Sequence, residues 1–178
     1  MPKPVIYLVD TPQMAAYFEE RLKRDLGDQV EIVVGYDASD LWLLFKTRGC
    51  PDAVILQQRI VYGDEILRVN PDINFDDEDD EHAGSRILSY LHEHSFPVDL
   101  NQTYVVLFDG QVASRPGRID RSLAFLRRQG LLSMEYRKPF DSIDLIGRLC
   151  KRFGFNDPYE FLREWAPEDK MRPEDAAE

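Results

Sequence analysis

Short apolar runs alternate with segments of helical periodicity along most of this chain, and this alternation limits the folds it can adopt. Five stretches have the length and apolar character of β-strands: 5–9, 30–34, 53–56, 104–108 and 131–136. The segments between and after them repeat apolar residues at the spacing of amphipathic helices: 12–26, 40–48, 83–94, 118–129 and 142–153. Strands that are apolar throughout are buried on both faces, so the pattern predicts an α/β domain with a doubly wound, five-stranded parallel sheet.

The chain has 178 residues, which is the size of one domain with small additions. The alternating pattern ends near residue 154, so we predict a domain over 1–154 and a C-terminal segment over 155–178. That segment contains one further helical pattern, from 158 to 165. Residues 59–82 have no clear period and are predicted to form an insertion after the third strand.

The net charge of −11 comes mainly from two segments of the chain. The acidic run 76–81 contains six acids and no base, and the tail 167–178 adds −3, so together they hold −9 of the −11. The run is a solvated loop, a surface that docks a partner, or a clamp onto the chain's own arginines. An acidic chain lacks the positive surface that binds phosphate backbones, so nucleic acid is not expected as a partner.

Several features point to a cytoplasmic protein. No apolar stretch reaches the roughly 18 residues that a membrane-spanning helix needs, and residues 1–10 do not have the pattern of a signal peptide. Cys50 and Cys150 are too few and too far apart for a disulfide framework or a zinc site, and we expect both to be buried.

Polar residues stand at the predicted carboxyl ends of four strands. In an open parallel sheet this edge is where functional side chains gather. The residues in question are Asp10, Gln57, Asp109 and Lys138. We find no glycine-rich phosphate loop after the first strand and no nucleophile elbow, so the sequence does not predict an enzyme.

Four stretches, in the same order and at the same strand ends, resemble a known family. They are Val5–Asp10 (VIYLVD), Gly35–Asp40 (GYDASD), Pro51–Gln57 (PDAVILQ) and Arg137–Phe140 (RKPF). Over residues 4–154 the chain resembles the receiver domain of bacterial two-component response regulators, which has a flavodoxin-like (βα)5 fold.

The resemblance also shows where this chain departs from receiver chemistry. The phosphate-accepting Asp of the family corresponds to Gln57, its first-strand acid pair to Asp10 and Thr11, and its hydroxyl residue on the fourth strand to Asp109. Two of three carboxylates around the metal are therefore missing, and we expect Mg²⁺ binding to be weak or absent, with no other cofactor. Lys138 is retained, and is expected either to pair with Asp10 or Asp109 or to lie in ordinary polar packing.

The favoured function is a pseudo-receiver: a signalling and protein-interaction module that works without phosphorylation. The candidate partner-binding residues are Arg115, Arg118, Arg121, Arg127, Arg128 and Tyr136. The resemblance implies a protein partner, such as a histidine kinase or an output protein, or a second copy bound through 118–129, 131–136 and 142–153. Glu135 stands where the family often has an aromatic switch residue.

Two alternatives remain open at this point. One is a working receiver that is phosphorylated with Mg²⁺ at a relocated acid: Asp10, Asp109 or a member of the acidic run. The other is an enzyme or small-ligand binder on a flavodoxin-like sheet, for which the fold alone is no argument.

Overall fold

The computed structural model describes residues 2–63, 83–94, 99–109, 121–137 and 142–164, except the side chains of residues 109, 137, 163 and 164. The chain forms two compact units, residues 1–140 and 141–178. The strands of the first unit are β1 (Val5–Val9), β2 (Glu31–Gly35), β3 (Ala53–Gln57), β4 (Tyr104–Asp109) and β5 (Met134–Arg137). Its helices are α1 (Pro12–Leu26), the short η1 (Gly27–Gln29), α2 (Ala38–Arg48), α4 (Ala83–Glu93) and α5 (Arg121–Arg128). The second unit contains α6 (Ser142–Phe153) and α7 (Glu160–Glu164).

The five strands form one parallel sheet in the order β2-β1-β3-β4-β5, which confirms the predicted fold class. The register places Val9 opposite both Gly35 and Leu56, so β1, β2 and β3 end at the same edge of the sheet. At that edge Gln57 pairs with Phe108, and Asp109 pairs with Arg137. Three of the four strand-end residues that the sequence singles out, Asp10, Gln57 and Asp109, therefore lie at one edge, and the fourth, Lys138, is outside the described residues. The predicted boundary after residue 154 falls inside the second unit and stays a prediction.

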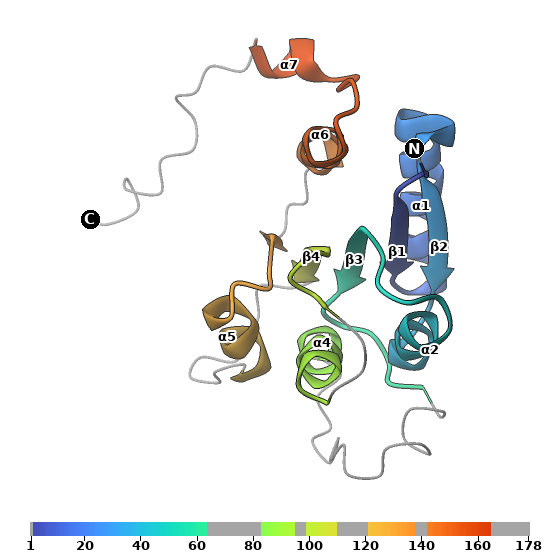
Figure 1. The fold of residues 1–178 in the computed structure, drawn as a ribbon. Helices are drawn as coiled ribbons and strands as arrows, with labels where there is room; N and C mark the ends of the chain where they lie inside the picture. The colour runs from blue at the N-terminus through green and yellow to red at the C-terminus, as the bar shows by residue number, and fades with distance from the viewer. Residues whose placement is uncertain (1, 64–82, 95–98, 110–120, 138–141, 165–178) are drawn as a thin grey trace, which may run out of the picture. The chain divides into compact units, whose positions relative to one another are not determined.

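The two faces of the sheet carry different helices. Alternate strand residues, among them Tyr7, Val54 and Leu107, share one buried cluster with side chains of α2, α4 and α5. These three helices lie in a row beneath the strands in Figure 1. The intervening strand residues face the other way, where Phe108 stacks on Phe18 of α1 with ring centroids 5.3 Å apart. Because the inner strands β1 and β3 are buried on both faces, their apolar runs are continuous rather than alternating.

Helix α2 begins at Ala38, whereas the sequence predicts a start at residue 40 with Ser39 as the N-cap. Asp37 is the N-cap, with its carboxylate accepting the Asp40 N–H at 2.7 Å. The first two backbone amides of the helix, those of Ala38 and Ser39, donate to the carbonyls of Val61 and Tyr62, respectively, both at 2.9 Å. The expected cap was wrong because part of this helix start is satisfied by backbone from more than twenty residues further along the chain.

One of the two cysteines also differs from expectation. Cys150 is buried as predicted, but Cys50 is exposed, because it lies in the turn before β3 at the amino end of the sheet. Its sulfur accepts the Asp99 N–H at 3.2 Å. Hydrogen bonds from the side chain and backbone of Asn101 lower the pKa of the Asp99 carboxyl at this same end. No described helix is long and apolar enough to cross a membrane.

Tyr7 gives the fold a testable dependence on alkaline pH. Its ring is buried, and its hydroxyl donates to the Gly49 carbonyl at 3.0 Å. Burial raises the pKa of the Tyr7 phenol, and Arg48 partly opposes that shift. A group with a raised folded pKa contributes stability that is complete below its unfolded pKa, about 10 for tyrosine, and is lost as the pH rises through the folded value.

We therefore expect the free energy of unfolding to fall above about pH 10, and to fall less steeply in Tyr7→Phe. At neutral pH this variant should cost about 1 kcal/mol, the usual value of one hydrogen bond. Urea unfolding of both proteins between about pH 8 and about pH 11 measures the difference. Equal slopes against pH in the two proteins would contradict this role of Tyr7.

Candidate functional site

Asp10 follows β1 and is held in place by backbone groups. It is buried, and its Oδ1 accepts the Thr11 N–H at 2.7 Å. Its own N–H donates to the Gly35 carbonyl at 3.3 Å. Thr11 is exposed and stands at the start of α1, where its side chain makes no capping hydrogen bond. The sequence prediction that Asp10 lies at the site edge is correct, and one of its oxygens already has a partner in the next peptide.

Gln57 is the last residue of β3 and lies half-buried between β1 and β4. Its side-chain oxygen accepts the N–H of Gln58 at 3.2 Å. The amide therefore folds back on its own backbone at the position that resembles the receiver phosphate acceptor. An amide group is neutral and is a poor nucleophile compared with a carboxylate.

Gln58 is a site residue that sequence reasoning missed. Its side chain is 3% exposed and makes two hydrogen bonds to the first turn of α4. The oxygen Oε1 accepts the Ser85 N–H at 3.0 Å, and Nε2 donates to the Ser85 Oγ at 2.9 Å. The backbone carbonyl of Gln58 accepts the Gly84 N–H at 2.9 Å. Gln58 thus accepts hydrogen bonds from two amides at the start of α4, which lie 26 and 27 residues further along the chain. No local sequence pattern indicates these contacts.

Glycine at position 84 allows this close approach of helix and strand. A Cβ atom added there would lie 2.5 Å from the Gln57 carbonyl oxygen and 2.9 Å from the Gln58 Cα. Both neighbours are backbone atoms and cannot rotate away. The first turn of α4 therefore lies directly against the end of β3.

The first residues after Gln58 cross from β3 to the start of α2. Ile60 and Tyr62 are buried in the core cluster, whereas Val61 between them is exposed. The Tyr62 carbonyl accepts both the Ser39 N–H and the Ser39 hydroxyl, each at 2.9 Å. The predicted insertion 59–82 thus begins as a fixed segment, and its residues 64–82, with the acidic run, lie outside the described residues.

The ends of β4 and β5 are described only in part. Asp109 is the last residue of β4 and is paired in register with Arg137, but its side chain is outside the description. Lys138 also lies outside the described residues, so its pairing with Asp10 or Asp109 stays a prediction. No cluster of three potential metal-ligating side chains occurs in the described part of the chain. Weak or absent Mg²⁺ binding likewise stays a prediction.

Tyr136 and Glu135 lie on opposite faces of β5. Tyr136 is buried and stacks on Phe108 at 5.6 Å, which extends the contact of Phe108 with Phe18 into a three-ring stack. Glu135 instead accepts three hydrogen bonds from Arg127 of α5: its Oε2 accepts from Nε at 2.9 Å and from Nη2 at 2.5 Å, and its Oε1 accepts from Nη2 at 2.6 Å. A bidentate ion pair therefore occupies the place where the family resemblance puts an aromatic switch.

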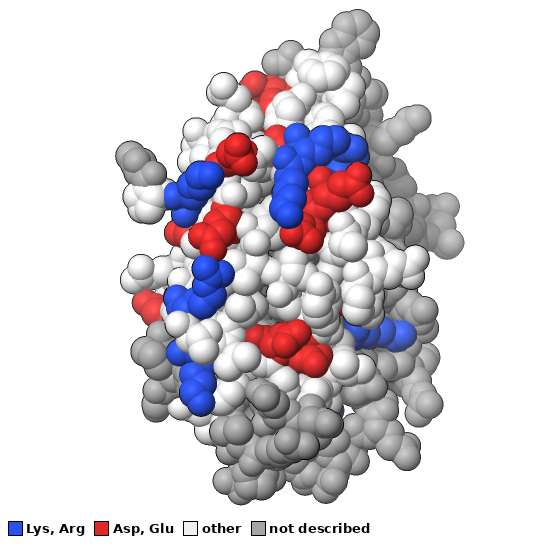
Figure 2. All heavy atoms as spheres, turned by 90° about the vertical axis from the view of Figure 1, so that its right-hand side faces the viewer, with Lys and Arg blue, Asp and Glu red and all other residues white. Residues whose placement is uncertain are grey.

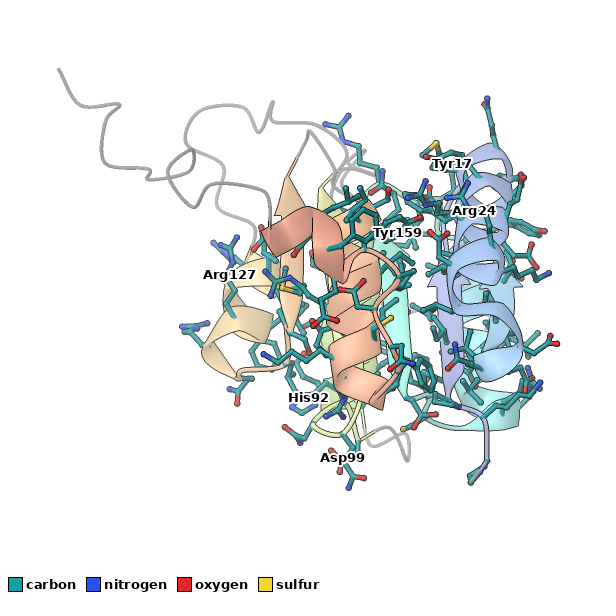
Figure 3. All side chains as sticks on the ribbon, turned by 90° about the horizontal axis from the view of Figure 1, so that it is seen from above. Tyr17, Arg24, His92, Asp99, Arg127 and Tyr159 are labelled. Carbon is teal, nitrogen blue, oxygen red and sulfur yellow. The ribbon has the colours of Figure 1, made fainter. Side chains whose placement is uncertain are left out.

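Of the five candidate partner-binding arginines, the described residues include three, and two of these form no ion pair with another described residue. Arg121 and Arg128 are exposed on α5, and neither forms an ion pair with another described residue. Arg127 between them is paired with Glu135, and Figure 3 shows it on the outer side of α5, across the molecule from Tyr17 and Arg24 of α1. Arg115 and Arg118 lie outside the described residues.

The face at the β2 edge is different, because its charges are mixed. Figure 2 shows Lys and Arg side chains standing beside Asp and Glu over this face. Individual ion pairs agree with this mixture: Lys23 pairs with Glu19 at 2.6 Å, and Arg48 pairs with Glu31 at 2.6 Å. Such exposed pairs contribute little stability, but they leave no large field of one sign.

Comparison with known proteins identifies the fold. No protein-family model and no curated protein matches the sequence. The response regulator receiver domain protein (CheY-like) from Methanospirillum hungatei JF-1 matches with a TM-score of 0.56 and 10% identity, over 86% of this chain and 95% of that one. The signal receiver domain of an HD domain-containing protein from Pseudomonas fluorescens Pf-5 matches with a TM-score of 0.55 and 18% identity, over 86% and 96%.

The same fold also occurs in a chain with a different name. The adenylate cyclase from Rhodopirellula baltica matches with a TM-score of 0.53 and 11% identity, over 92% of this chain and 95% of that one. At such identities structural similarity establishes the fold and leaves chemistry to the individual side chains. The chain has the receiver fold, and its activity must be argued from the edge where β1, β3 and β4 end.

Proposed function

We propose that this protein is a signalling and protein-interaction module that uses the receiver fold without phosphorylation. The observation that carries the proposal is the end of β3, where the amides Gln57 and Gln58 stand in sequence and both are hydrogen-bonded to backbone. Phosphorylation at this place would need an ionised carboxylate as the nucleophile toward a phosphoryl donor. We assign the protein no catalytic residue.

The metal requirement supports the same proposal. Mg²⁺ takes hard, preferably anionic oxygen ligands in octahedral geometry. Of the three carboxylates that the resemblance implies around the metal, only Asp10 is retained, and one of its oxygens accepts the Thr11 N–H. Losing two anionic ligands from a partly buried site should cost several kcal/mol of Mg²⁺ affinity.

Incubation with acetyl phosphate and Mg²⁺ tests the proposal directly. We expect the intact mass, measured near neutral pH to preserve an acyl phosphate, to stay unchanged. The gain of one phosphoryl group would contradict the proposal and favour a relocated acceptor. In that case Asp10→Asn and Asp109→Asn, made separately, would show whether either acid carries the group, since an amide in its place cannot accept it, and an adduct on both variants would leave the acidic run 76–81 as the acceptor.

The proposed interaction surface is the outer face of α5. Arg121 and Arg128 are seven residues apart, so they lie two helical turns, about 10 Å, apart on one stripe. With Arg127 neutralised by Glu135, this pair of cations would attract an acidic partner segment. Histidine kinases, output proteins and a second copy of the chain are candidate partners. Tyr136 is not kept among the binding residues, because its ring is 8% exposed and stacked on Phe108.

Charge reversal separates this surface from general electrostatics. We expect the double variant Arg121→Glu/Arg128→Glu to bind at least about tenfold less of a partner than the wild-type protein does. Binding by the wild-type protein should also weaken as the salt concentration rises. Lys23→Glu/Lys46→Glu is the matched control, since it makes the same change in charge on α1 and α2. Quantitative pull-down against the captured partner measures both. Equal loss in the two double variants would mean that net charge matters and α5 does not.

A further inference from the structure

The contact between Gln58 and the start of α4 joins the site edge to a helix by buried polar groups. Gln58 and Ser85 are 3% and 0% exposed, and the Gln58 side chain makes two hydrogen bonds to Ser85, one to its hydroxyl and one to its backbone N–H. Burial keeps water from replacing these bonds, so opening them leaves unsatisfied groups behind. The backbone adds a third bond, from the Gly84 N–H to the Gln58 carbonyl.

Contacts between described residues connect the start of α4 to α5, the helix that carries Arg121 and Arg128. Helix α4 packs against α5, and the ring of His92 lies 6.0 Å from the ring of Phe125. Both helices share the core cluster that includes Leu88 and Leu126. At the far side of α5, Arg127 is fixed to Glu135 of β5 by its bidentate ion pair, from Nε to Oε2 and from Nη2 to Oε1. Each step joins two elements by a specific contact.

We propose that Gln58 is a built-in latch that holds α4, and through it α5, in one arrangement without any ligand at the site edge. The latch rests on the proposed function, because a module that works without phosphorylation needs its interaction face ordered at all times. In this arrangement Gln58 is a positioning residue, which acts through its hydrogen bonds to Ser85. The stripe of Arg121 and Arg128 is thereby presented constitutively.

Hydrogen exchange in Gln58→Met tests the latch. Methionine has nearly the same length and volume, so the variant removes the hydrogen bonds of the side-chain amide, including the two to Ser85, and little packing. We expect amides of α4 to exchange about 10- to 100-fold faster, with a smaller but measurable increase in α5. Exchange in β1 and α1 should stay within about threefold of wild type, because these elements lie outside the chain of contacts.

Two further variants make the result specific. Gln57→Met is the matched control, since it removes the neighbouring amide, which bonds to backbone beside it and not to α4. Gln58→Glu should restore slow exchange, because a carboxylate accepts from both the N–H and the hydroxyl of Ser85 and is favoured at a helix start. Unchanged exchange in α4, unchanged exchange in α5, or a uniform increase in all elements would each overturn the latch. A phosphoryl adduct on the wild-type protein would overturn the proposed function instead, so the two failures are distinguishable.

Discussion

Gly84→Ala is expected to destabilise the first unit by about 3 kcal/mol, although alanine is the better helix former. The gain in helix propensity is at most about 1 kcal/mol, and is smaller in the first turn of a helix. Against it stands a Cβ that would lie 2.5 Å from the Gln57 carbonyl oxygen, a distance that packed atoms do not adopt. Helix α4 would have to move away from β3, which would also stretch the hydrogen bonds of Gln58 to Ser85.

Urea unfolding of Gly84→Ala beside Gly130→Ala measures the effect. Gly130 has a φ of 68°, and a Cβ added there would meet no other atom within 4 Å. The only cost of its alanine variant is therefore that of placing a residue with a Cβ in the left-handed conformation. That costs about 1 kcal/mol. A loss at Gly84 no larger than the loss at Gly130 would mean that the helix start can shift freely, and that the close approach has no importance for stability.

Phe108→Ala is expected to cost about 3–5 kcal/mol, the usual range for removing a buried phenylalanine. Phe108 lies at the centre of the three-ring stack, between Phe18 of α1 and Tyr136 of β5. Its removal leaves a cavity bordered by two large rings, each already held by its own element. Because one side chain contributes to both contacts, the loss should exceed that of a residue packed on one neighbour only.

Phe161→Ala provides the same chemical change at an exposed position. Phe161 is 60% exposed in α7, so its truncation should change the free energy of unfolding by no more than about 0.5 kcal/mol. Phe108→Leu, which refills part of the space, should fall between the two. If Phe108→Ala and Phe161→Ala were equally mild, the stack would make no special contribution to the fold.

The strands and helices could be predicted because their signals are local. The apolar runs at 5–9 and 53–56 have strand length, and Gly27 ends α1 as its position after the last apolar residue indicates. The helix starts were harder. Ser39 has the right residue type for a cap, yet Asp37 and the carbonyls of Val61 and Tyr62 satisfy this end of α2.

The site was only half predictable for a related reason. The strand ends Asp10 and Gln57 follow from the sheet pattern, since parallel strands bring their carboxyl ends to one edge. The partner of Gln58 is 27 residues away, and no periodicity points to it. Likewise, no local pattern in the sequence indicates that Arg127 pairs with Glu135, because that acid belongs to the next strand and meets the arginine only in the folded chain.

The segment that leaves β3 and returns to it is anchored at both ends by described contacts, at Tyr62 on α2 and at Gly84 on β3. The contacts that hold the described residues on either side of the segment are therefore made by residues outside 64–82. A sequence change between residues 64 and 82 removes none of these contacts.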